Sequence, residues 1–250
     1  MKKNFNPASL SILFTLLLIV PALHAGTNRP KKSDLHRPAG STIAKPLSKS
    51  FREEADSLYS EIDLGSYGLS EKAFEYALKG YTYLIEHHQI TKSDIISICD
   101  FSQSSRNKRL YIVDLEEKKV LINTYVAHGR KSGSEYARSF SNSMQSHKSS
   151  LGFYVTDQTY YGDHGLALKI RGLERGFNDK ASARNIVIHG SEYVGPDFIK
   201  FNKFNGRSFG CPAVPSSEAD EVIQAIKNGT CLFIYHPTKK YIARSKILNS

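Results

Sequence analysis

A cysteine and a histidine in two glycine-containing segments are the residues best suited to covalent chemistry. Cys211 lies in GRSFGCPAVP (206–215), where glycine and proline predict a shaped loop that brings the thiol toward solvent. His189 ends NIVIH, which is typical of a β-strand, and Gly190 follows it. An imidazole near a thiol can act as its base, so that the sulfur becomes a nucleophile. The backbone N–H groups of Gly210 and Cys211 would then suit the oxyanion of an acyl-transfer reaction.

By themselves, a histidine and a cysteine at this separation are weak support for catalysis, and Cys211 could equally be a disulfide partner. Cys99 and Cys231 lie in apolar segments, where thiols usually pack as small hydrophobic groups. In an oxidising compartment these two could instead pair with each other. Because the chain has three cysteines, one thiol must stay free, and its loop position makes Cys211 the candidate.

Two other histidines precede glycine, and each allows two interpretations. His128 ends the segment YVAH, and His164 lies in YYGDHG. Histidines at such places can contact substrate, although hydrogen-bonded structural roles are more common. His147 suggests a comparison with zinc enzymes, but Tyr154 stands where the acidic ligand is expected, and the chain has no His-Glu-x-x-His segment. We therefore expect no metal and no cofactor.

Export is predicted by residues 1–25. Lys2 and Lys3 precede an apolar run that ends at Leu23, and Ala25 provides the small residue at which a signal peptide is cleaved. The run is short for a membrane span, so we favour a cleaved leader over an uncleaved anchor. The mature chain is expected to be periplasmic or secreted, without a stable membrane span.

The formal net charge of the chain is +10. In an exported protein, a positive balance indicates anionic envelope polymers or membrane surfaces as partners, or simply a solvated basic surface. The sequence contains no nucleic-acid-binding motif, and we expect no nucleic acid partner.

The rest of the chain divides into a linker, a helical extension and a larger domain. Residues 26–50 are rich in Pro, Ser and Lys and predict a disordered linker. Residues 51–92 contain two amphipathic patterns, which predict a short helical hairpin. Residues 93–250 change to short strand patterns with one helix at 216–229, so the fold class is mainly β with α (α+β). The predicted strands are IISIC, RLYIVDL, KVLINTYVAH, LGFYVT, LALKI, NIVIH and CLFIY.

Several segments together resemble the catalytic domain of the L,D-transpeptidases, the YkuD-type cysteine enzymes of bacterial cell walls. The resemblance covers about residues 93–236 and includes a His-Gly followed, after a spacer, by Ser-x-Gly-Cys. It is carried by IHG, GRSFGCPAV, DFSQSS, RLYIVDL, YVAHGRKSG, FSN, SSLGFYVT, YYGDHG, GLERGFN and RNIVIHGSEYV. It implies a YkuD-like β-sandwich or barrel that acts on peptidoglycan, within a catalytic domain at 93–250.

The resemblance also implies a role for each residue of the signature. Cys211 would be the nucleophile and His189 its base, oriented by the carbonyl of Gly190. Ser208 would brace the loop, and the N–H groups of Gly210 and Cys211 would supply oxyanion donors. The implied partners are peptidoglycan stem peptides, in which the cysteine would attack the diaminopimelate carbonyl of a tetrapeptide.

The chain departs from the family pattern near its cysteine. Phe209 stands at the position of the family's second histidine, so a polarising imidazole is missing. The arginine that commonly follows the family cysteine is also missing, and Arg207 is a candidate to hold a substrate carboxylate instead. Phe209, His128 and His164 complete the set of candidate substrate contacts. The spacer from His189 to Ser208 is longer than usual for the family, which suggests a larger lid at residues 191–205, SEYVGPDFIKFNKFN.

The resemblance leaves the fate of the acyl group open. It could pass to another stem as a 3→3 crosslink, to water as in an L,D-carboxypeptidase, or to an outer-membrane lipoprotein. A non-catalytic murein-binding module with the same fold is the alternative from another class. The resemblance further implies that carbapenem β-lactams can trap the cysteine.

Overall fold

The computed structural model describes residues 48–163 and 165–250. The predicted signal peptide (1–25), residues 26–47 of the predicted linker and His164 lie outside the described residues.

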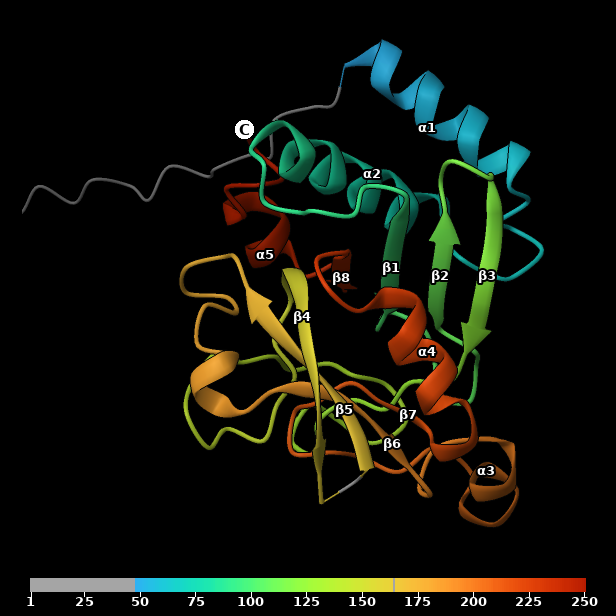
Figure 1. Cartoon of the computed structure of the whole chain (residues 1–250), viewed down its shortest axis with the longest axis vertical. Helices are drawn as coiled ribbons and strands as arrows, with labels where there is room; N and C mark the ends of the chain where they lie inside the picture. The colour runs from blue at the N-terminus through green and yellow to red at the C-terminus, as the bar shows by residue number, and fades with distance from the viewer. Residues whose placement is uncertain (1–47, 164) are drawn as a thin grey trace, which may run out of the picture. The chain divides into compact units, whose positions relative to one another are not determined.

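The strands of the described part form one mixed sheet in the order β3-β2-β1-β8-β4-β5-β6-β7 (Figure 1). The pairs β1–β8 and β6–β7 are parallel, and the other neighbours are antiparallel. This arrangement confirms the α+β class, and β2 and β3 form an antiparallel hairpin. The strands are β1 (Ile95–Asp100), β2 (Leu110–Asp114), β3 (Lys119–Thr124), β4 (Gly152–Gly162), β5 (Gly165–Gly172), β6 (Val187–Ser191), β7 (Ala213–Pro215) and β8 (Cys231–Tyr235).

Two helices precede the sheet, as the amphipathic patterns predict. Helix α2 begins after Ser70, whose side chain accepts a hydrogen bond from the N–H of Ala73, as an N-cap does. Its apolar face packs against β1 and β8 (Figure 1). The helices are α1 (Lys49–Glu61), α2 (Glu71–Glu86), α3 (Pro196–Asn202), α4 (Ala219–Ile226) and α5 (Lys239–Arg244), with 3-10 turns at Ser182–Arg184 and Ser216–Glu218.

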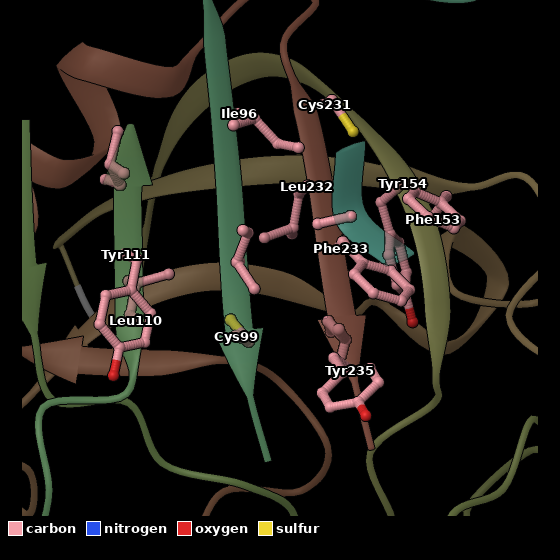
Figure 2. Close-up of a cluster of buried hydrophobic side chains, with 14 of the residues drawn as sticks. Ile96, Cys99, Leu110, Tyr111, Phe153, Tyr154, Cys231, Leu232, Phe233 and Tyr235 are labelled. Atoms are coloured by element: carbon pink, nitrogen blue, oxygen red, sulfur yellow. The ribbon is translucent and has the colours of Figure 1, made fainter. Parts of the chain in front are cut away.

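The core lies on the central strands and is apolar and aromatic (Figure 2). Phe153 of β4 and Phe233 of β8 stack with ring centroids 4.1 Å apart, and both are fully buried. Full burial of such a side chain contributes about 1.5–3 kcal/mol. Gly80 of α2 allows this packing, because a Cβ there would lie 1.9 Å from the Phe153 ring. The core therefore locks α2 and the centre of the sheet together.

Cys99 and Cys231 are buried free thiols in this core. The parallel register pairs Cys231 with Ile96, three residues before Cys99 on β1. Three residues of strand are about 10 Å, which exceeds the span of a disulfide. The possible Cys99–Cys231 bridge is therefore not formed, and both residues pack as small hydrophobic groups (Figure 2).

The strand expected over residues 119–128 is shorter in the structure. It ends at Thr124 as β3, and the segment after it crosses to the other end of the sheet. There Ala127 forms a bridge with Ala213, and Gly129 forms one with Ser208. This crossing segment thus lies against the loop that carries the candidate nucleophile.

None of the helices in the described ranges combines the length and apolar character needed to cross a membrane.

Candidate active site

Cys211 lies between β6 and β7, in a loop that forms one wall of a pocket of about 560 Å³. The thiol is partly exposed, and its Sγ lies 3.7 Å from the carbonyl oxygen of Asn185. The pocket is lined by Tyr160, Gly162, Asp163, Ala167, Arg184, Asn185, Ile186, Val187, His189, Tyr193, Arg207, Ser208, Phe209 and Cys211. The structure thus brings Cys211, His189, Ser208, Arg207 and Phe209 of the predicted site together.

His189 is held by the sheet and by its own neighbour. It lies on β6, where it pairs with Ala213 of β7, two residues after the cysteine. Its ring Nδ1 lies 2.9 Å from the carbonyl oxygen of Gly190. Because a carbonyl only accepts, Nδ1 carries the proton and donates, which leaves Nε2 as the basic nitrogen. The side chain is 5% exposed, so this tautomer is fixed in a nearly buried ring.

Gly190 is required by close packing behind the histidine. A Cβ at this position would lie 2.9 Å from the Cβ of Ala219 and 3.2 Å from the Cα of Ser216. Those residues open the helical segment that includes α4. The missing side chain of Gly190 therefore lets α4 approach β6, while the Gly190 carbonyl accepts from the His189 ring.

Ser208 is hydrogen-bonded to the cysteine loop through its side chain. Its hydroxyl donates to the carbonyl of Cys211 at 2.6 Å and accepts from the N–H of Gly210 at 3.0 Å. The backbone of Ser208 also bonds to the crossing segment, since its N–H donates to the carbonyl of His128 at 3.0 Å and its carbonyl accepts from Arg130 at 2.7 Å. The loop is therefore tied on two sides.

This bracing changes the predicted oxyanion site. The N–H of Gly210 is already used by Ser208, whereas the backbone of Cys211 itself lowers the pKa of its own sulfur. An acyl carbonyl bound to that sulfur would lie close to the N–H of Cys211. Of the two N–H groups expected to stabilise an oxyanion, that of Gly210 is hydrogen-bonded within the loop, and that of Cys211 is the remaining candidate donor.

Gly210 has a φ of +128°, which a side chain would strain. A Cβ there would lie 2.8 Å from the carbonyl of Lys148 and 3.0 Å from Nη2 of Arg184. Arg184 itself donates to Lys148 at 2.6 Å and to the carbonyl of Ser141 at 2.9 Å. The guanidinium thus fixes the serine-rich segment on which the cysteine loop rests.

Burial raises the pKa of the Cys211 thiol above its ordinary value. Hydrogen bonding by the Val187 and Cys211 backbones and the charge of Arg184 lower the pKa without reversing its direction. The resting sulfur is therefore a neutral thiol at neutral pH, rather than a preformed thiolate. A base must remove its proton during the reaction, which is the role that the His189 ring can take.

The structure does not bring the His128 side chain into the pocket. It is fully buried, and its Nδ1 accepts a hydrogen bond from Arg109 at 2.8 Å. Burial and the Arg109 charge lower the pKa of His128 to about 3, so the ring is neutral. Its Nε2 lies 3.4 Å from the carbonyl of Gly133, which also accepts from Arg207 at 3.2 Å. The His128 side chain therefore reaches Arg207 of the pocket indirectly, through the Gly133 carbonyl that both contact.

Phe209 is 60% exposed and projects beside the cysteine. The ring of His147 lies 4.6 Å from its ring, and the guanidinium carbon of Arg130 lies 5.3 Å from its centroid. The contact between Arg130 and the Phe209 ring is a cation–π contact. The site that holds a histidine in the wider family thus holds an aromatic ring here, with an imidazole and a guanidinium against it.

The expected lid is a loop closed at its base. The N–H of Gly206 donates to the carbonyl of Tyr193 at 2.7 Å, and the buried side chain of Asn205 accepts from the N–H of Gly195 at 2.7 Å. Asn205 also donates to the carbonyl of Ser105 at 2.5 Å. The lid loop contains α3. It lies next to the cysteine loop in the chain, because the cysteine loop begins at residue 206.

Within the described ranges, no group of three or more His, Cys, Asp or Glu side chains is placed to hold a metal ion.

Sequence reasoning missed the arginines that shape this site. Arg109 is fully buried, and it donates to the carbonyls of Val126 and Gln103 at 2.7–3.1 Å. Arg184 and Arg130 are distant in sequence from the cysteine, and no local pattern marks them. Arg130 lies in YVAHGRKSG, and its position directly after the His-Gly is the one local signal that marks it.

Fold and site together define a class, an α+β protein in which a cysteine and a histidine line the same pocket. The family model described as L,D-transpeptidase catalytic domain matches residues 66–235, which is more than half of the chain. The protein therefore belongs to the L,D-transpeptidase catalytic-domain family. The match begins before α2, so it includes the second predicted helix as well as the sheet. No curated protein matches the chain significantly in sequence.

Solved structures of this kind are only distantly similar. An L,D-transpeptidase from Mycobacterium smegmatis has 9% identity and a TM-score of 0.35, with 57% of this chain and 59% of that chain covered. The helical cell shape determining protein from Campylobacter jejuni has 15% identity and a TM-score of 0.37, with 69% and 61% covered. An L,D-transpeptidase fragment from Xylanimonas cellulosilytica has 13% identity and a TM-score of 0.33, with 77% and 94% covered. The chain thus spans about 60% of the length of the Mycobacterium smegmatis and Campylobacter jejuni proteins.

Proposed function

We propose that the protein is an exported peptidoglycan L,D-transpeptidase that works through a thioester at Cys211. The observation that carries the proposal is the shared pocket of Cys211 and His189, with Nδ1 of the histidine committed to Gly190. Family membership supports the same reaction type. The predicted signal peptide supports an exported, periplasmic or secreted, location.

In the first step, the sulfur attacks the diaminopimelate carbonyl of a tetrapeptide stem. Nε2 of His189 takes the thiol proton as the C–S bond forms, and the N–H of Cys211 stabilises the oxyanion. The imidazolium then gives the proton to the departing amine, and terminal D-Ala leaves as the C–N bond breaks. The raised thiol pKa makes this proton transfer part of the step.

In the second step, an acceptor takes the acyl group from the sulfur. An amine of a neighbouring stem gives a 3→3 crosslink, and an amine of an outer-membrane lipoprotein would give an anchored protein. Water would give the tripeptide, as in an L,D-carboxypeptidase. We place the crosslink first, because the open pocket of about 560 Å³ gives a second peptide room beside the thioester.

Two observations favour the alternative of a non-catalytic murein-binding module. The N–H of Gly210 is occupied and the thiol pKa is raised, and both weaken a reactive cysteine. Such a module would bind stem peptides without changing them.

The test is incubation of the purified protein with disaccharide-tetrapeptides, followed by mass spectrometry of the products. The proposal expects loss of D-Ala together with 3→3 dimers, both absent for Cys211→Ala. Tripeptide without dimers would identify a carboxypeptidase. Unchanged tetrapeptide that nevertheless binds the protein would establish the binding module.

A further inference from the structure

A second pocket of about 400 Å³ adjoins the one that contains Cys211. The two pockets share the side chains of Arg207 and Phe209, which precede the nucleophile by four and two positions. The far wall of the second pocket comes from the lid, through Phe198, Asn202 and Phe204. A molecule bound there would therefore lie against the cysteine loop and contact Phe209, a residue that also lines the thiol pocket.

The charge of this second pocket comes from two arginines. Arg130 and Arg207 both line it, and both are exposed side chains. No carboxylate of the described ranges forms an ion pair with either guanidinium. Two positive groups that share a pocket and lack an acidic partner favour an anionic ligand.

Both guanidiniums are held in place rather than free to move. Arg130 packs over the Phe209 ring at 5.3 Å, and its backbone is bonded to Ser208. Arg207 donates to the carbonyl of Gly133 at 3.2 Å, and that carbonyl is also in contact with the buried His128. A pre-positioned guanidinium loses less conformational entropy on binding a carboxylate, and its planar fork suits that group.

We propose that Arg130 and Arg207 form the carboxylate-binding part of the acyl-acceptor site. The ligand class is an amine whose own carbon carries a carboxylate, which is the form of the side-chain end of diaminopimelate. This inference rests on the proposed function and adds the acceptor's recognition to it. It also gives Phe209 a role, since the ring that replaces the family's second histidine supports Arg130.

The chemistry of the acceptor step sets the geometry. The neutral amine attacks the thioester carbonyl, the C–N bond forms and the C–S bond breaks. The sulfur leaves as thiolate, and His189 takes the proton lost by the nitrogen. The carboxylate is not consumed, so its binding across Phe209 can orient the amine toward the thiol pocket throughout the step.

Transfer from a disaccharide-tetrapeptide donor to glycine or to methylamine tests the proposal, because methylamine is glycine without its carboxylate. The measured quantity is the ratio of acyl-amine product to hydrolysed tripeptide. We expect Arg130→Ala and Arg207→Ala each to lower this ratio at least tenfold for glycine and less than twofold for methylamine. Phe209→Leu, which removes the ring under Arg130, should lower the glycine ratio in the same direction.

Arg175→Ala is the matched control, since this arginine lines two other pockets, neither of which contains the cysteine or the lid. It should behave as the unaltered protein with both amines. Equal ratios in all variants would overturn the proposal while leaving the thioester mechanism intact. So would slower thioester formation in Arg130→Ala with unchanged ratios, because the arginine would then serve the donor. If the unaltered protein forms no thioester, the proposed function itself fails.

Discussion

At Cys211, opposing effects set the reactivity of one sulfur atom. Burial raises its pKa, whereas two backbone groups and Arg184 lower it by smaller amounts. The raised pKa favours the protonated thiol at rest, so the proposed mechanism requires a base, and His189 in the same pocket is the candidate. A resting thiol of this kind also oxidises less readily than a preformed thiolate.

Replacement of the imidazole should therefore change the pH dependence of the cysteine. In His189→Ala, the sulfur reacts only through direct ionisation, so alkylation at pH 7 should fall about 100-fold or more. Because the thiol pKa is raised, the ionised fraction grows only as pH rises above the ordinary cysteine value of about 8.5. Rates of iodoacetamide labelling from pH 6 to 10 measure this, with the exposed His87→Ala as control. Superimposable profiles for His189→Ala and the unaltered protein would remove His189 from the base role.

Gly210 allows a sharper test of the loop, because another glycine provides a matched control. Gly210→Ala forces a Cβ to 2.8 Å from Lys148, so the loop must shift and turnover should fall at least tenfold. Gly176 also has a positive φ, of +84°, but a Cβ there would meet nothing within 4 Å. Gly176→Ala should lose some stability to backbone strain and keep its turnover. Equal turnover in both variants, measured by D-Ala release, would mean that the loop position is not critical.

At the scale of elements, one buried carboxyl group joins the turn after β5 to β4 and α5. Glu174 accepts from the N–H of Phe153 at 2.9 Å and from the hydroxyl of Tyr241 at 2.8 Å, and it also bonds to Ser245. The carboxyl is 4% exposed. It satisfies donors from β4 and from α5 with its C-cap residue, and it therefore ties the C-terminal helix to the sheet.

Glu174→Ala should accordingly destabilise the protein by about 3 kcal/mol or more, because it leaves several buried donors unpaired. Urea unfolding followed by circular dichroism measures the change, and Glu116→Ala on the surface should stay within about 0.5 kcal/mol. A loss below 1 kcal/mol for Glu174→Ala would show that water or neighbouring groups replace the carboxyl.

The same group gives a pH dependence with a definite sign. Burial raises the pKa of Glu174, so the folded protein binds this proton more tightly than the unfolded chain does. Its contribution to stability is complete below the ordinary value of about 4.3 and is lost as pH rises through the raised pKa. Glu174→Gln should remove this decline from the stability curve. The account is contradicted if the difference in stability between the two proteins does not change with pH in that window.

Much of this element structure could be predicted from the sequence, because strands of β-branched residues and an N-cap serine have local signals. The course of the segment after Thr124 could not be predicted. The bridges to Ser208 and Ala213, which turn this segment toward the site, join residues far apart in the sequence. The bond between Gly210 and Ser208 was also missed, because it depends on loop geometry. The pairing of Arg130 with Phe209 joins two segments far apart in the chain, and no local pattern contains it.

At the scale of the whole molecule, the sheet order determines which thiols can react. Because β8 lies between β1 and β4, Cys99 and Cys231 are enclosed in the core, and Cys211 alone reaches a pocket. Burial raises the pKa of Cys99 to about 12, which further suppresses its reactivity. The sequence predicted these strands but not that order, which follows from long-range packing.

Counting of thiols with a colorimetric disulfide reagent should show this arrangement. The native protein, prepared without reductant, should react rapidly at one cysteine, and the denatured protein at all three. Only one reactive thiol after denaturation without reductant would mean that Cys99 and Cys231 are bridged. The fast thiol should disappear in Cys211→Ala.

The central claim, acyl transfer to Cys211, is tested most directly by intact-protein mass spectrometry after exposure to a carbapenem. This strained β-lactam can acylate the sulfur by ring opening, and its oxyanion would use the same N–H as the peptide. Because Phe209 replaces a polarising histidine, acylation should be slower than in a family member that has the full motif. We expect one added drug mass on the peptide that contains Cys211, and none in Cys211→Ala. Protein that stays unmodified after long exposure, while disaccharide-tetrapeptides also remain unchanged, would contradict the enzyme and favour a binding module.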